Sequence, residues 1–161
     1  MKEKLQEYAL IAEIIGGIAI VASLVFVGFQ VNQTAEETAL NTLQMQANAY
    51  QDLSSQITAL NHILIENPEV DVLSKTSLNY DDLSLEDQVR VGAFVIMIVR
   101  MSDMAYHQFE QGMISEERLM SAVGPLADNL CNPIYRQIWQ NISKNFVQNY
   151  QNFVSGLFDN C

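Results

Sequence analysis

The sequence predicts an all-α protein in which one N-terminal transmembrane helix continues into a soluble bundle of about four helices. An apolar run near the N-terminus is long enough to cross a bilayer, and apolar residues recur every three or four positions through the rest of the chain. Gly and Pro number only seven and three in 161 residues, too few for the turns of an all-β fold. The predicted divisions are a short N-terminal tail over 1–8, a transmembrane helix over 9–30, a helical stem and first bundle helix over 31–66, and the remainder of the helical bundle over 67–161.

The apolar run over 9–29 reads ALIAEIIGGIAIVASLVFVGF, and Glu13 is its only charged residue. At ~1.5 Å of rise per residue, a helix of this length spans a hydrocarbon core of ~30 Å. A cleaved signal peptide is the competing interpretation. The run is too long for one, and the best nearby cleavage position, after Ala35, has Gln33 where a small residue is required. We therefore expect an uncleaved anchor.

One face of this helix consists of small residues, and Gly17 and Glu13 lie on an adjoining stripe. In lipid, helices associate through close van der Waals contact, which small side chains permit. An ionised carboxylate is costly against lipid, so Glu13 is expected to face a partner helix, water or the headgroup boundary. The residues predicted to mediate membrane-helix association are Ala9, Ala12, Glu13, Gly16, Gly17, Ala19 and Ser23.

The charges beside the membrane segment bear on topology. Lys2 and Lys4 precede it, and no Lys or Arg follows until Lys75. The positive-inside rule then places the N-terminus in the cytoplasm and the domain outside. The predicted location is the bacterial inner (plasma) membrane, crossed once.

The stretch 30–66 lacks Pro and Gly, so the membrane helix is expected to run on into it without a break. It carries an apolar stripe that favours one wall of a bundle over a coiled-coil stalk, because charge pairs flanking the stripe are missing. Asn67-Pro68 ends this helix, since the residue before proline is pushed out of the α region. The stripe consists of Leu40, Leu43, Ala47, Tyr50, Leu53, Ile57, Leu60 and Leu64.

Three more helices are expected after a loop that reaches about Leu83. The first opens at a capping box of Ser84 and Asp87, contains the apolar run 91–99 and closes at Gly112; nine apolar residues are too few for a second span. The next runs over about 115–130. The last begins at Asn132-Pro133 and is expected to be one continuous helix with an apolar face of Ile134, Ile138, Ile142, Phe146, Tyr150, Phe153 and Leu157.

The best polar constellation lies on one face of the helix that precedes Gly112, at spacings of three, four and three residues. It consists of Arg100, Asp103, His107 and Glu110. A metal site or a titrating His107 is one interpretation. A structural polar cluster, with an Arg100–Asp103 ion pair anchoring the bundle, is the one we favour.

The remaining composition argues against several classes of function. The net charge of −11 is repelled by phosphate backbones, so no nucleic-acid partner is expected. The two cysteines, Cys131 and Cys161, form no zinc motif, and a disulfide between them requires the domain to lie outside the cytoplasm. No catalytic, metal or cofactor signature is present, so no cofactor and no enzymatic activity are predicted.

Three strings carry a resemblance: AEIIGGIAIVASLVFVGFQVNQ, VRMSDMAYHQFEQGMISEE and NPIYRQIW. Along nearly its whole length the chain resembles a family of small uncharacterised bacterial single-pass membrane proteins. These have an IAEIIG-type membrane helix, an R-x-x-E-x-x-Y-x-x-x-x-x-G helix and a final helix with Trp. Such relatives often carry Arg or Lys just after the span, which implies a cytoplasmic domain. Here that stretch, VNQTAEET, has no base, so the side stays open. The family has no assigned activity.

We therefore predict a non-enzymatic, membrane-anchored structural or accessory subunit, which self-associates or belongs to a larger membrane protein complex. Its expected partners are membrane lipid and either copies of itself or other membrane subunits. The alternative is a membrane-tethered helical module that senses a ligand or stress. A less favoured third possibility is an oligomeric pore lined by Glu13.

Overall fold

The computed structural model describes residues 2–158, and it is all-helical, which confirms the predicted fold class. No strand occurs in that described range. The elements are α1 (Lys2–Glu66), α2 (Pro68–Ser74), the 3-10 turn η1 (Tyr80–Asp82), α3 (Leu85–Glu110), α4 (Glu116–Ala127), α5 (Pro133–Ile142), the 3-10 turn η2 (Ser143–Asn145) and α6 (Gln148–Phe158).

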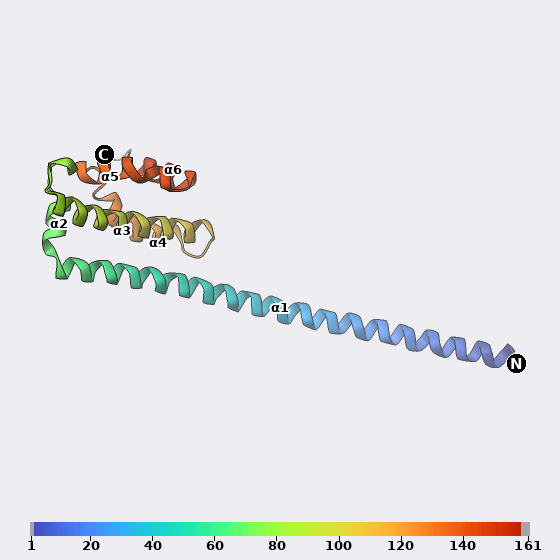
Figure 1. Cartoon of the computed structure of the whole chain (residues 1–161). Coiled ribbons are helices and arrows are strands. Elements are labelled where there is room, and N and C mark those ends of the chain that lie inside the picture. Colours follow the sequence, from blue (N-terminus) through green and yellow to red (C-terminus); the bar gives the residue numbers. More distant parts are fainter. Residues whose placement is uncertain (1, 159–161) are drawn as a thin grey trace. The chain divides into compact units, whose positions relative to one another are not determined.

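The chain divides into two compact units, Met1–Gln44 and Met45–Cys161. The first contains the N-terminal part of α1. The second contains the remainder of α1 together with α2 to α6. Helix α1 is one uninterrupted element, as the lack of Pro and Gly over 30–66 predicts (Figure 1).

Helix α3 is the centre of the second unit. It packs against α2, α4 and α5, and its apolar run 91–99 supplies much of the core (Figure 1). Arg90 and Arg100, which flank this run, are exposed. Six of the nine residues of the run are buried, whereas Ala93, Ile96 and Met97 are exposed, so this central helix keeps one side open to solvent. The largest fully buried side chains of the unit are Tyr135, Tyr150, Leu119, Leu126, Leu130, Ile134, Val91, Val95, Val99, Val123 and Val154.

The C-terminal part of α1 contributes one wall of this unit. Leu53 and Leu60 are buried, and Ile57 and Leu64 are half-buried against the same core. The predicted stripe is therefore in contact with the core over these positions. Its earlier members, among them Tyr50, are exposed.

The prediction of about four bundle helices is not confirmed, because the second unit divides more finely. The stretch expected to be a loop up to Leu83 contains α2 and η1. Pro68 occupies the first turn of α2, where its fixed φ and missing N–H are tolerated. The negative charges of Glu69 and Asp71 in the same turn interact favourably with the positive end of the helix dipole. These N-terminal residues, together with the burial of Val70, stabilise a helix of only seven residues.

The expectation of one continuous last helix is wrong. The chain leaves the helical conformation at Phe146, whose φ of −114° and ψ of 158° are extended, so α5 and α6 are separate helices joined by η2. The break buries the Phe146 ring, which is 7% exposed and lies 5.6 Å from the ring of Trp139.

The predicted helix ends are confirmed where capping residues specify them. Ser84 Oγ accepts a hydrogen bond from the Asp87 N–H at 3.2 Å and begins α3. Gly112, with φ of +69°, follows the end of α3 in a conformation that favours glycine. Asn132 Oδ1 accepts from the Ile134 N–H at 2.9 Å and begins α5.

Candidate functional site

The small-residue face of the first unit is open to solvent. Ala9, Ala12, Ala19 and Ser23 are exposed, and Gly16 is half-buried. A Cβ built on Gly16 would meet nothing within 4 Å, and the same is true of Gly17. Within the described chain, nothing therefore covers this face or competes with an approaching helix.

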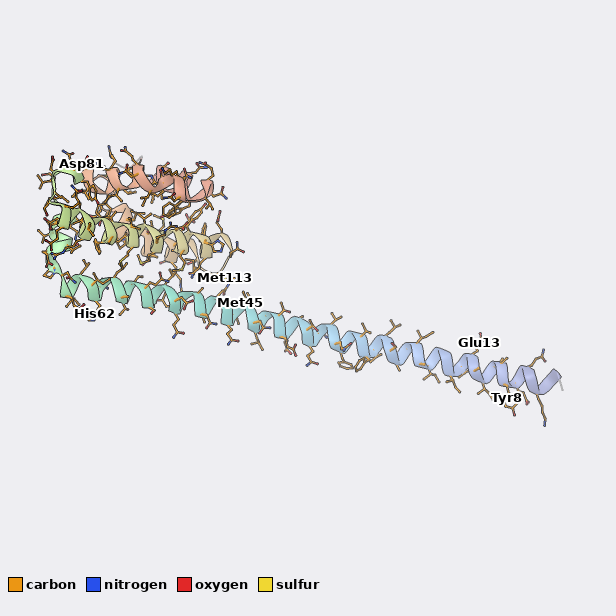
Figure 2. All side chains as sticks on the ribbon, in the orientation of Figure 1. Tyr8, Glu13, Met45, His62, Asp81 and Met113 are labelled. Carbon is orange, nitrogen blue, oxygen red and sulfur yellow. The ribbon has the colours of Figure 1, made fainter. Side chains whose placement is uncertain are left out.

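Glu13 projects from the same part of α1 (Figure 2). Its side chain is exposed, and it makes no hydrogen bond or ion pair with any other described residue. Its neighbours three and four residues away along the helix are Ala9, Leu10, Gly16 and Gly17, and none of them carries a polar side chain. A carboxylate so placed requires water, a headgroup or a partner's polar group as its neighbour.

The polar row on α3 does not converge on one point. The Arg100 Nη1 atom lies 3.8 Å from the Asp103 Oδ2 atom, which is the long limit of an ion pair. The Arg100 guanidinium also stacks over the Phe146 ring, 4.2 Å from its centroid. Arg100 thereby connects α3 to the segment between η2 and α6.

Glu110, at the end of the row, is bound to a different helix. Its Oε1 atom accepts a hydrogen bond from the Asn149 Nδ2 atom of α6 at 3.0 Å. His107 is exposed, and its backbone carbonyl accepts the Gln111 N–H at 3.1 Å as α3 ends. Two members of the row, Arg100 and Glu110, therefore connect α3 to the C-terminal segments, whereas Asp103 pairs within α3.

Asp103 is the one member of the row that is half-buried. Burial raises its pKa above the ordinary 3.8, and the nearby Arg100 and His107 act in the lowering direction. Burial is the larger effect because removing water penalises the charged form more than Arg100 and His107 favour it. The carboxylate of Asp103 therefore costs the folded state stability at neutral pH.

In the part of the chain that the structure describes, no three His, Cys, Asp or Glu side chains gather as metal ligands would. The second histidine, His62, lies on α1 and pairs with Glu66 at 3.4 Å (Figure 2). The sequence left open whether Cys131 and Cys161 form a disulfide, and Cys161 lies outside the described residues.

An aromatic cluster surrounds the buried Tyr150, and Tyr106 of α3 is the member that the sequence did not indicate. The centroid of the Tyr150 ring lies 5.7 Å from that of Tyr106, 5.9 Å from that of Trp139 and 5.4 Å from that of Phe146. The Tyr150 hydroxyl donates to the Val99 carbonyl at 2.9 Å, and burial raises the pKa of this phenol. The apolar face of 134–157 contained several of these residues, but only the fold brings Tyr106 of α3 to them.

Helix α1 is the one helix, among the residues described, that is long and apolar enough to cross a membrane. Its most apolar stretch has no buried part. No protein-family model, curated protein or solved structure matches the chain. The resemblance to small bacterial single-pass membrane proteins therefore stays a prediction.

Proposed function

We propose that this chain is a non-enzymatic, membrane-anchored structural or accessory subunit of the bacterial inner membrane, which assembles through the N-terminal part of α1. The observation that carries the proposal is the exposed apolar surface there. Ile15 is 61% exposed, Leu24 67% and Phe26 63%.

Exposure on this scale is unfavourable in water. Leaving one large apolar side chain in water instead of burying it costs about 1.5–3 kcal/mol, and this segment repeats that cost along its length. A helix in the core of a soluble protein avoids the cost by packing against other elements, whereas this segment has no buried part. Insertion into a bilayer removes this free-energy cost without any protein partner, so membrane insertion is the favoured interpretation.

The small-residue face then gives the anchor a second role. Inside a bilayer every helix is surrounded by apolar groups, so association depends on how closely two backbones approach. Gly16 permits that approach, and Glu13 on the adjoining stripe supplies a polar group that a partner helix satisfies. The partner is a second copy of this chain or another membrane subunit.

The test compares two identical substitutions on α1. Gly16→Leu places bulk on the small-residue face. Gly28→Leu makes the same change about 120° around the helix, at 3.6 residues per turn. An added Cβ meets nothing within 4 Å at either position, so neither change disturbs the chain's own packing.

Cross-linking of the full chain in membranes is the measurement. We expect cross-linked species for wild type and Gly28→Leu, and their loss in Gly16→Leu and in the Gly16→Leu/Gly17→Leu double variant. Unchanged cross-linking in the double variant would contradict assembly through this face. Recovery of the wild-type chain in the soluble fraction would contradict membrane anchoring.

A further inference from the structure

The second unit contains a cleft of about 260 Å³ that no sequence pattern indicates. Its walls come from α1, α2, α3, the C-terminal end of α4 and the start of α5. Its floor is apolar and includes Leu60, Phe94, Ile98, Met101 and Tyr135, all of them buried core residues. Ligand pockets are concave, with mostly apolar walls and a few polar groups, and this partly open cleft has that form.

Polar residues gather at the same cleft. Asn61, Asp71, Lys75 and Asp128 contribute to its lining. The Lys75 Nζ atom is already engaged, at 2.8 Å from the Asp71 Oδ1 atom. The Asp128 carboxylate is exposed and has no hydrogen bond or ion pair with another described residue.

Charge and size together define what fits. Two carboxylates and one ammonium leave the lining with one net negative charge, in a chain whose overall charge is −11. A cation is therefore attracted and an anion repelled. An apolar cavity of ~150 Å³ suffices for benzene, so this larger volume accommodates one ring with a short side arm.

We propose that this cleft binds a small amphipathic amine, with its aromatic or branched apolar body against Phe94, Ile98 and Met101 and its ammonium group at Asp128. The site lies within the second unit. It depends neither on membrane insertion nor on assembly through α1.

The probe is 2-phenylethylamine, titrated by ligand-observed NMR into the full chain in phosphatidylcholine nanodiscs, with empty nanodiscs as the background. Two isosteres separate charge from shape: 2-phenylethanol is neutral, and 3-phenylpropionate is an anion. We expect saturable binding of the amine, weaker binding of the alcohol and none of the acid.

Two pairs of variants locate the site. Asp128→Asn removes the charge at the cleft, and Asp52→Asn removes an exposed charge elsewhere. Leu64→Trp fills the cleft from its half-buried wall, whereas Ile65→Trp adds the same ring at a neighbouring position that is 77% exposed and outside the lining.

Asp128→Asn should weaken amine binding about fivefold, as expected for an exposed ion pair near 1 kcal/mol. Leu64→Trp should abolish it, and both controls should bind as wild type does. The proposal is overturned if the amine shows no saturable binding, if the acid binds as well as the amine, or if Leu64→Trp leaves binding unchanged.

Discussion

Gly92, in the N-terminal third of α3, offers a test in which a single hydroxyl group decides the sign of a stability change. A Cβ built on Gly92 would lie 2.6 Å from the Tyr80 hydroxyl oxygen, far inside van der Waals contact. That hydroxyl donates to the Gln88 carbonyl at 2.7 Å. Gly92→Ala must therefore displace Tyr80 and break this hydrogen bond.

The magnitude follows from three terms. Loss of the hydrogen bond costs about 1 kcal/mol, and overpacking of the contact costs about 1–3 kcal/mol. Alanine recovers about 1 kcal/mol of helix propensity relative to glycine. We expect Gly92→Ala to lower the free energy of unfolding by about 1–3 kcal/mol.

Tyr80→Phe removes the atom responsible. The next ring atoms, Cζ and Cε2, lie 3.5 and 3.7 Å from the added Cβ, which are ordinary contacts. In the Tyr80→Phe background, Gly92→Ala should therefore stabilise the protein by up to about 1 kcal/mol. The sign of the substitution reverses, and the double-mutant cycle shows a coupling of about 1–4 kcal/mol.

The assay is urea unfolding of the full chain in mild detergent, followed by the fluorescence of Trp139. Gly156→Ala is the control, because its Cβ meets nothing within 4 Å and no proline follows it in α6, and it should be neutral or stabilising. If Gly92→Ala is equally destabilising with Tyr80 and with phenylalanine at that position, the packing argument is refuted.

Three further predictions concern the second unit. Tyr150→Phe should lower the free energy of unfolding by about 1 kcal/mol, because the buried Val99 carbonyl loses its hydroxyl donor; an unchanged urea midpoint would contradict this. Because the folded-state pKa of Asp103 is raised above 3.8, wild type should lose stability relative to Asp103→Asn as pH rises through that pKa. Urea midpoints at about pH 3 and pH 7 test this, and a pH-independent difference would refute it. The Arg118 guanidinium lies 4.1 Å from the Tyr50 ring centroid, so a double-mutant cycle should give a coupling of about 0.5–1 kcal/mol; a coupling of zero would show that the contact contributes nothing.

Local signals explain which parts of the fold were predictable. The capping residues Ser84 and Asn132 and the glycine at 112 each act within a few residues of the helix end they specify, and the structure places helix ends at all three. The uninterrupted α1 follows equally from the absence of Pro and Gly. Fold class depends on such local rules together with apolar periodicity.

The break at Phe146 and the cleft depend instead on tertiary contacts. The apolar period of the last segment continues through Phe146 without interruption, so periodicity alone favours one helix. The extended conformation there is selected by packing against Trp139 and Arg100, residues of two other elements. Asp71 and Asp128 are likewise far apart in sequence and line one cleft only after α2 and α4 have packed on α3.

In the candidate site, too, local helical geometry was predictable from the sequence and tertiary contacts were not. The small residues of α1 share a face because helical geometry alone brings them together. The interpretation of Arg100 to Glu110 as one cluster is incomplete, because Glu110 binds Asn149 of α6 and Arg100 stacks on Phe146. Spacing along a helix indicates which residues share a face, but not which neighbouring element each of them contacts.

We propose that this chain is an uncleaved membrane anchor that assembles. The most direct measurement is the native mass of the tagged full chain, extracted from its own host's membranes in mild detergent, with every co-purifying protein identified. We predict either a multiple of 18.1 kDa or a stoichiometric complex with other membrane subunits. A lone monomer without partners, or a chain shortened at its N-terminus and found in the soluble fraction, would contradict the account.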